Sequence, residues 1–229
     1  MYLYETHCHT DVVSKCSIFS PSQIVDCYVK NGYTGVFITD HFLNGNCHFY
    51  IRDSKLSFEK RISLFCEGYK QVKTLADDKL QVFFGFEYSY LGTDLLIYGW
   101  DERKLKSLPE IMELSMREFI YFAKANGALV VQAHPFREAD YIDHIRLFPE
   151  VEGVEVYNAC RDNRCNSLAE FYATQYNKYK LSGSDAHTNM LEKLGGMAFE
   201  EKLKDEYDFI ERIRAGKGHI HRQENKLLW

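Results

Sequence analysis

The sequence predicts an α/β protein built as a closed or nearly closed barrel of seven mainly parallel strands. Short apolar runs of strand type alternate with amphipathic helical segments along almost the whole chain of 229 residues. This alternation is typical of parallel strands joined by helical crossovers. One barrel accounts for the length, and a hydrophobic fraction of 45% without a visible linker favours a single domain over residues 1–229, with 217–229 as a C-terminal tail.

The strands are expected at short apolar segments that precede polar or histidine-containing stretches. They are 1–4, 34–39, 80–86, 95–99, 128–133, 153–156 and a seventh segment in which 180–183 lead into its end at 184–187.

The helices are expected between these strands, where start and stop signals occur. Ser20, Pro21 and Gln23 form a capping-box pattern with proline at the first helical position. Apolar residues recur at spacings of three and four over 58–75, and Gly127 follows another amphipathic segment. The expected helices are 21–31, 58–75, 109–126, 141–148, 166–178 and 204–215.

Residues of metal-binding type cluster where the predicted strands end. The active sites of such barrels lie at the C-terminal ends of the strands. His7 and His9, at i and i+2 in extended backbone, project to one side and can chelate one ion. Imidazoles and carboxylates suit Zn²⁺, Mn²⁺ or Fe²⁺, and a carboxylate such as Glu87 can bridge two ions. The set is His7, His9, Asp40, His41, Glu87, His134, Asp185 and His187.

Competing catalytic patterns are missing from the sequence. It contains no P-loop, no dinucleotide-binding fingerprint and no G-x-S-x-G elbow. Activation of water by metal ions is therefore the chemistry that these residues favour.

Four motifs, taken in order, resemble those of the PHP (polymerase and histidinol phosphatase) family. They are His7-Cys8-His9-Thr10, Thr39-Asp40-His41, His134-Pro135 and Gly183-Ser184-Asp185-Ala186-His187, within residues 5–200. The resemblance implies a distorted seven-stranded (β/α)7 barrel with two or three divalent ions, Zn, Mn or Fe. It also implies hydrolysis of a phosphate monoester by a metal-activated hydroxide.

The same resemblance implies how the ions are shared. One ion is expected to bind four side chains, a second to bind a glutamate and a histidine, and a third to bind two histidines. The three sets are His7, His9, Glu87 and Asp185; Glu87 and His134; and His41 and His187.

Two positions depart from the family pattern. Many members have a histidine before the fourth strand, where this chain has Asp94, which we expect to bind the second ion. Many have a histidine or aspartate after the first histidine pair. Here residues 11–16 offer Asp11 as the only good oxygen ligand, so the third ion depends on this loop. Asp40 is expected to fix the tautomer of His41 rather than to bind metal.

Further residues are candidates for the reaction. Arg137, three residues after His134, can hold a phosphoryl oxygen, and Asp185 can accept the proton of the attacking water. His187 completes the expected catalytic set. Arg161 and Arg164 are open between the role of Arg137 and the surface, and Glu155 is open between a structural and a substrate contact. We expect solvated or incidental roles for His48, His144, His219 and His221, and plain thiols at Cys160 and Cys165.

Net charge and cysteine content indicate the class of substrate and the cellular location. A net charge of −5 without a Lys or Arg run longer than two disfavours a groove for extended nucleic acid. It favours a small phosphorylated substrate, with a nucleotide or short oligonucleotide still open. The sequence has no apolar stretch of membrane-spanning length and no signal-peptide pattern, so we expect a cytoplasmic protein whose seven cysteines are free thiols.

Several alternatives stay open at this point. The substrate could be histidinol phosphate, a nucleotide, an oligonucleotide end or a phosphotyrosine-bearing protein. A hydrolase of C–N or ester bonds and a non-catalytic metal-binding barrel are the other classes. The oligomeric state is not predicted.

Overall fold

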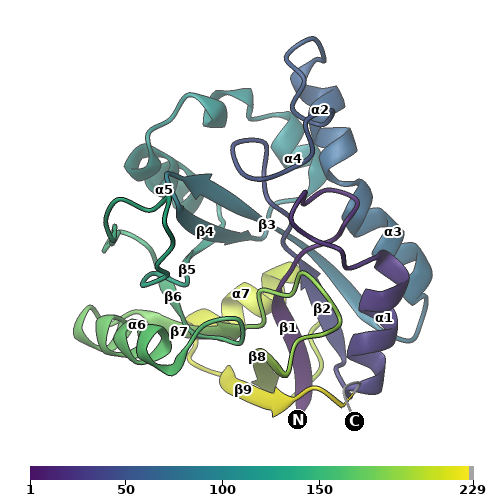
Figure 1. Ribbon diagram of the computed structural model, residues 1–229, viewed down its shortest axis with the longest axis vertical. Helices are drawn as coiled ribbons and strands as arrows, with labels where there is room; N and C mark the ends of the chain where they lie inside the picture. The colour runs from purple at the N-terminus through teal and green to yellow at the C-terminus, as the bar shows by residue number, and fades with distance from the viewer. Residues whose placement is uncertain (227–229) are drawn as a thin grey trace.

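The computed structural model describes residues 1–226, in which a nine-stranded sheet curls into a nearly closed barrel with helices around it (Figure 1). The strands are β1 (Tyr2–Cys8), β2 (Gly35–Ile38), β3 (Gln81–Tyr90), β4 (Thr93–Tyr98), β5 (Leu129–Ala133), β6 (Gly153–Asn158), β7 (Tyr179–Gly183), β8 (Lys193–Phe199) and β9 (His219–Glu224). The helices are α1 (Pro21–Lys30), α2 (Phe58–Phe65), α3 (Glu67–Ala76), α4 (Glu102–Lys106), the 3₁₀ helix η1 (Pro109–Met112), α5 (Met116–Ala125), α6 (Asn163–Gln175) and α7 (Glu206–Arg214).

The strand order is β7-β6-β5-β4-β3-β2-β1-β8-β9. Strands β1 to β3 are parallel, as are β5 to β7, and β4 runs antiparallel to both of its neighbours. The seven mainly parallel strands predicted from the sequence are therefore β1 to β7. Two further strands, β8 and β9, extend the sheet beyond β1 in antiparallel pairing and were missed.

The barrel closes where the end of β1 meets the end of β7. The Thr6 hydroxyl donates to the Ser182 carbonyl at 2.7 Å. Farther along, the Ala186 amide donates to the His7 carbonyl at 3.1 Å, and the His9 amide donates to the Ala186 carbonyl at 2.9 Å. This contact brings the first and last motifs of the sequence side by side.

Aromatic side chains fill the barrel interior and close one of its ends. Phe209 of α7 packs against Phe37, Tyr98 and Phe199, with ring centroids 4.5, 5.2 and 6.0 Å away. Strands β2, β4, β5 and β6 are buried on both faces, because these rings fill the inside while helices cover the outside. The polar site lies at the opposite end, where the parallel strands finish.

Local signals explain why some helices match the prediction. The capping box of Ser20 and Gln23 is present at α1, as the sequence predicts. A second capping box, Ser115 with Glu118, starts α5 and divides the predicted helix 109–126 into η1 and α5. The helix predicted at 58–75 is also two helices, α2 and α3, which meet at Cys66.

Two predictions from the sequence are wrong. Residues 141–148 form a mostly irregular loop rather than a helix, because the side chain of Gln132 binds the backbone there: it donates to the Arg146 carbonyl at 2.7 Å and accepts from the Phe148 amide at 3.1 Å. The tail also contains a strand, β9, which pairs along its length with β8. No helix within residues 1–226 has the length and apolar character needed to cross a bilayer.

Candidate metal centre

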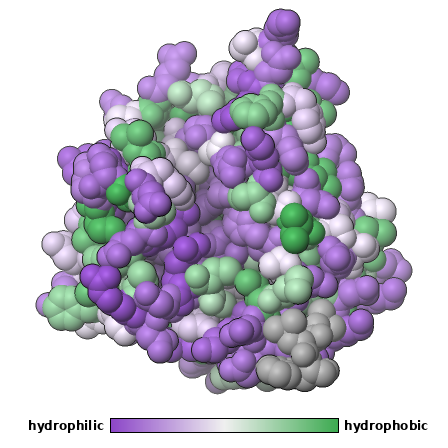
Figure 2. Space-filling model, in the orientation of Figure 1, coloured by the Kyte–Doolittle hydropathy of each residue, from purple (hydrophilic) through white to green (hydrophobic). Residues whose placement is uncertain are grey.

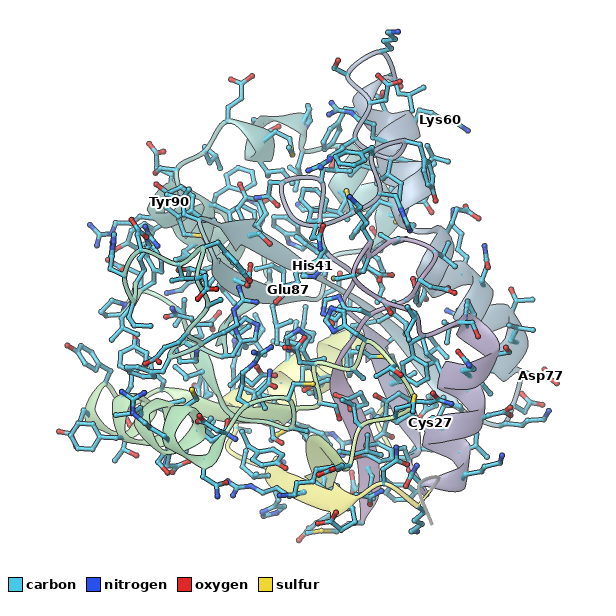
Figure 3. All side chains as sticks on the ribbon, viewed as in Figure 1. Cys27, His41, Lys60, Asp77, Glu87 and Tyr90 are labelled. Carbon is cyan, nitrogen blue, oxygen red and sulfur yellow. The ribbon has the colours of Figure 1, made fainter. Side chains whose placement is uncertain are left out.

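A polar cavity of about 490 Å³ opens at the C-terminal ends of the strands. Its lining includes Glu87, Asp94, His134, Asp185 and His187. The space-filling view shows a hydrophilic hollow near the middle of the face (Figure 2), and His41 and Glu87 lie together at the centre of the stick view (Figure 3). The predicted ligand residues are thus gathered from β1, β2, β3, β4, β5 and β7 and from the turns beside them.

The rings of the first histidine pair, His7 and His9, are oriented by hydrogen-bond acceptors at their Nδ1 atoms. Nδ1 of His7 lies 2.9 Å from Oε1 of Glu155, a buried carboxylate on β6. A carboxylate at this site can only accept, so Nδ1 carries the proton and Nε2 offers its lone pair. Nε2 of His7 is buried and has no hydrogen-bond partner.

A serine fixes His9 in the same way. The Ser14 hydroxyl donates its single proton to Oδ1 of Asp40 at 2.7 Å, so it can only accept from Nδ1 of His9, 3.1 Å away. Asp40 also accepts from the amide and the hydroxyl of Thr10 at 2.7 and 2.8 Å. The expectation that Asp40 orients His41 is wrong, because Asp40 acts on His9 through Ser14.

Glu87 on β3 is the hub of the centre. Its oxygens lie 3.4 Å from Nε2 of His7, 3.6 Å from Nε2 of His9, 3.3 Å from Nε2 of His134 and 2.7 Å from Nδ1 of His41. Both oxygens are buried without a hydrogen-bond partner. A carboxylate so placed among imidazoles is suited to bridge two ions.

The spacing of these atoms fits metal ligands better than hydrogen bonds. Tetrahedral zinc with ligands at about 2.0–2.2 Å requires ligand atoms about 3.3–3.6 Å apart, whereas hydrogen bonds need roughly 2.7–3.2 Å. Nε2 of His7 and of His9 each lie 3.5 Å from Oδ1 of Asp185. The distances from His7 and His9 to Glu87, at 3.4 and 3.6 Å, fall in the same range.

Asp185 and His187 follow β7 in a bent segment. Asp185 has a φ of +57°, and His134, which follows β5, has a φ of +25°. Such values are uncommon for residues other than glycine and mark positions where the fold holds a side chain in a special orientation. Nδ1 of His187 lies 2.9 Å from the Asp185 carbonyl, and its ring stacks on His9 at 4.2 Å.

Asp94 joins the centre from the start of β4. Its Oδ2 lies 3.9 Å from Nε2 of His134 and 2.9 Å from the guanidinium of Arg137. Arg161 lies across the cavity and donates to Oδ2 of Asp185 at 3.0 Å. Both arginines line the cavity, and the Nε atom of each is buried without a hydrogen-bond partner.

The possible ligand atoms fall into four groups in which all members lie within 4.8 Å of one another. One group holds three of the four residues expected at the first ion, a second adds His9 to the two histidines expected at the third ion, and a third contains Asp94. The groups are His7, His9 and Glu87; His7, His134 and Asp185; Glu87, Asp94 and His134; and His9, His41 and His187.

Asp11 belongs to none of these groups within the described residues and does not line the cavity. Cys16, five residues farther along the loop, does line it. This thiol is not among the residues predicted from the sequence, because only an oxygen ligand was expected in the loop.

Electrostatics in the cavity favour metal binding. Burial alone would raise the pKa values of Glu87 and Asp185, but the surrounding histidines outweigh it and hold both below their usual range. Burial, with His187 and His41 nearby, lowers the pKa of His9, which keeps this ring neutral. Burial opposes charge on His7 as well, yet Glu155 and Asp185 raise its pKa, so metal binding must compete there with a proton.

Cys16 also has an unusual environment. Burial raises the pKa of its thiol, whereas its interactions with His187 and His41 lower it, and the net result is a pKa of about 6.

The remaining candidates lie away from the cavity. Arg164 is exposed and pairs with Glu138. His48 contacts the backbone carbonyl of Asp11, and His144 is exposed beside Asp143. The structure places His219 and His221 on β9, and it places Cys160 and Cys165 in none of the four ligand groups. All seven cysteines are free thiols, as predicted.

The comparisons with known proteins agree with this picture. Residues 163–217, which include Asp185 and His187, match the family model described as PHP-associated. No curated protein matches the chain.

Three solved structures share the fold at 14% identity. A two-domain Bacteroides vulgatus protein, described as containing a predicted PHP-like metal-dependent phosphoesterase, has a TM-score of 0.66 over 96% of this chain and 64% of its own. A putative metal-dependent phosphoesterase from Bifidobacterium adolescentis has a TM-score of 0.56 over 91% and 94%. An amidohydrolase from Chromobacterium violaceum, with bound sulfate and no metal, has a TM-score of 0.55 over 81% and 87%.

The chain therefore spans a little under two thirds of the Bacteroides protein. Residues 163–217 thus resemble the PHP-associated family, and the fold of the chain is shared with structures described as PHP-like or as metal-dependent phosphoesterases.

Proposed function

We propose that the protein is a metal-dependent hydrolase and that its substrate is a phosphate monoester. The observation that carries this proposal is the convergence, in one cavity, of metal-ligand atoms without partners and two arginines that line its wall. Buried polar atoms are rarely left unpaired in a folded protein unless a bound group completes them.

The residues present fit divalent ions. When bound, these ions supply activation of water and neutralisation of phosphoryl charge. His7, His9, Glu87 and Asp185 would hold one ion, and Glu87, Asp94 and His134 would hold a second; the further set is His41 and His187.

The chain's own residues would bind the substrate and move a proton. Arg137 and Arg161 lie on the cavity wall and would each donate to a non-bridging phosphoryl oxygen. Asp185, whose pKa is held low by its histidine neighbours, is ionised and would accept the proton of the attacking water. His187, whose Nδ1 is held by the Asp185 carbonyl, would keep its ring in place beside this carboxylate.

The cavity favours a small substrate. A volume of about 490 Å³ lies within the range of roughly 300–1,000 Å³ that is usual for small-molecule sites. We therefore propose a small phosphorylated molecule, such as a nucleotide, as the substrate. We also propose that the protein is cytoplasmic.

Hydrolysis of a C–N bond is the second candidate, because the Chromobacterium neighbour is described as an amidohydrolase. The two arginines favour the phosphoester, since each can hold an anionic oxygen through its planar N–H groups.

The test is hydrolysis of a panel of phosphomonoesters, amides and esters by protein loaded with Zn²⁺, Mn²⁺ or Fe²⁺. We expect release of phosphate only from metal-loaded protein, its loss in His9→Ala and its retention in His144→Ala, a matched change at an exposed histidine. Turnover of amides alone would favour the second candidate. Two bound ions without turnover of any substrate would contradict the hydrolase, and fewer than two would favour a metal-binding barrel without catalysis.

A further inference from the structure

Asn158 is the last residue of β6, and its side chain lies fully buried among the residues that surround the metal centre. Its Nδ2 donates to Oε2 of Glu155 at 2.9 Å and, over a longer distance of 3.4 Å, to Oδ2 of Asp185. We propose that Asn158 is a positioning residue: by donating to these two carboxylates, it keeps metal ligands from three strands in the arrangement that binds the ions. The inference rests on the metal centre of the proposed function and is independent of the substrate.

Backbone contacts fix the direction in which the Asn158 amide points. Its Oδ1 accepts from the Cys160 amide at 2.9 Å. The oxygen of a side-chain amide can only accept and its nitrogen can only donate, so Nδ2 has to face the two carboxylates. A rotated amide would set Nδ2 against the Cys160 N–H and Oδ1 against two acceptors, and would lose all three contacts.

A second asparagine holds the backbone of Asn158 in place. Oδ1 of Asn166, near the start of α6, accepts from the Asn158 amide at 3.0 Å, and Nδ2 of Asn166 donates to the Asn158 carbonyl at 3.1 Å. The Arg161 amide donates to the same carbonyl at 3.1 Å. The end of β6 is thus tied to α6, and Asn158 presents its amide from a fixed backbone.

Glu155 extends the effect of Asn158 to two of the proposed ligands. Its Oε1 lies 2.9 Å from Nδ1 of His7, and its Oε2 accepts from the His134 amide at 3.0 Å. The φ of His134 is +25°, an uncommon value that persists only where the surroundings hold the backbone. The donor of Asn158 therefore keeps Glu155 where it sets both the tautomer of His7 and the backbone of His134.

Asp185 uses its two oxygens for different partners. Oδ2 accepts from Asn158 and from the guanidinium of Arg161, the latter at 3.0 Å. Oδ1 lies 3.5 Å from Nε2 of His7 and from Nε2 of His9, which is the spacing of ligands on one ion. Two donors on Oδ2 thus leave Oδ1 to face the position of the first ion.

Asn158 also lies between two buried negative charges. Glu155 is 1% exposed and Asp185 is 3% exposed, so water screens neither carboxylate well. Uncompensated charges in such a place are costly, and an N–H donor that they share offsets part of the cost. The amide does this without a charge of its own, whereas an aspartate of the same size would add a third carboxylate and remove the donor.

The experiment is calorimetric titration of metal-free, full-length protein with Zn²⁺, in wild type, Asn158→Ala and Asn158→Asp, with circular dichroism to check that each protein is folded. We expect Zn²⁺ affinity to fall about 10–100-fold in both variants, as is usual when a partner of a metal ligand is removed. Asn158→Asp keeps the size of the side chain and its acceptor for the Cys160 amide, so a loss of affinity there reports the missing donor rather than a cavity. It also decides the question if Asn158→Ala does not fold.

Asn31→Ala is the matched control. Asn31 is buried at the end of α1, and its Nδ2 donates to the Cys27 carbonyl and to Oδ1 of Asn225, both at 2.9 Å. It does not line the cavity. We expect this variant to have a lower Tm than wild type and the same Zn²⁺ affinity. A purely structural role of Asn158 would give that same result in Asn158→Ala.

The two proposals fail differently. Wild-type Zn²⁺ affinity in folded Asn158→Ala or Asn158→Asp would overturn this inference and leave the metal-dependent hydrolase standing. An equal loss of affinity in Asn31→Ala would also overturn it, because the loss would then follow from lower stability alone. Wild type that binds ions with an affinity dependent on Asn158 but hydrolyses no substrate would support the inference and contradict the hydrolase. Wild type that binds no ion would overturn both.

Discussion

Ser14→Ala should weaken metal binding by His9 without replacing any of the proposed metal ligands. The Ser14 hydroxyl donates to Asp40 at 2.7 Å and accepts from the His41 amide at 3.0 Å and from Nδ1 of His9 at 3.1 Å. Asp40 keeps its bonds from Thr10 in the variant. The His41 amide and Nδ1 of His9 would lose their partners in a fully buried place.

The magnitude follows from these two orphaned groups. Each costs about 1–2 kcal/mol, so Ser14→Ala should lose about 2–4 kcal/mol of unfolding free energy. For a domain of this size that corresponds to a fall in Tm of roughly 4–16 °C. Because Nδ1 of His9 would be free to lose its proton to Nε2, Zn²⁺ affinity should also fall about 10–100-fold.

The assay is calorimetric titration of metal-free protein with Zn²⁺, together with thermal unfolding. Ser63→Ala is the matched control, because its hydroxyl donates to the Glu59 carbonyl on α2, far from the cavity residues in the chain. Wild-type Zn²⁺ affinity in folded Ser14→Ala would refute the idea that this serine sets the tautomer of His9.

Three further predictions concern neighbouring groups. Glu155→Gln should lower Zn²⁺ affinity about 10–100-fold in calorimetry. A side-chain amide can donate as well as accept, so Nδ1 of His7 no longer has to carry the proton; an unchanged affinity would contradict this. Arg161→Ala should raise KM for a phosphomonoester at least about tenfold, as expected for the loss of a charge-assisted hydrogen bond, with unchanged metal content, whereas Arg164→Ala should not; equal kinetics would remove Arg161 from the site. In metal-free protein, alkylation of Cys16 should be half-maximal near its pKa of about 6 and level above it. Cys165, whose pKa burial raises, should still gain reactivity above pH 9.0, and parallel profiles would show that the histidines do not stabilise the Cys16 thiolate.

The sequence predicts the barrel well because its seven strands are buried and apolar and are separated by clear helix signals. It misses β9 because that strand is polar and half exposed, and is stabilised mainly by backbone pairing with β8. Such pairing leaves little trace in the hydrophobic pattern.

The ligand set is predictable for a similar reason, since position at a strand end already indicates the cavity. The direction in which each side chain points is harder to predict. Asp40 and His41 are adjacent, and neighbouring residues in extended backbone point to opposite sides, so Asp40 reaches Thr10 and Ser14 instead. The alternation of side chains could have given this result from the sequence.

Cys16 is different, because its place depends on the path of a loop. The loop crosses to the other end of the chain, where the Ile18 amide meets the His187 carbonyl. No local pattern predicts a contact between residues so far apart in sequence.

Asp94 shows how one reversed strand serves the site. In a barrel of parallel strands only the residue after a strand reaches the mouth, and Asp94 lies near the start of β4. It reaches the mouth because β4 is antiparallel, joined to β3 by the two-residue turn Leu91-Gly92, whose φ values are +49° and +80°. Both values suit a type I′ hairpin turn.

The sequence holds a signal for this reversal. Eight residues separate the strands expected at 80–86 and 95–99, and a parallel crossover needs a dozen or more. A hairpin is therefore the only connection that fits. Once β4 is reversed, Asp94 pairs with Ala133, the residue before His134, so an aspartate at this position lies beside the β5 histidine. The same turn length thus accounts for both the reversal of β4 and the presence of Asp94 among the three carboxylates of the cavity.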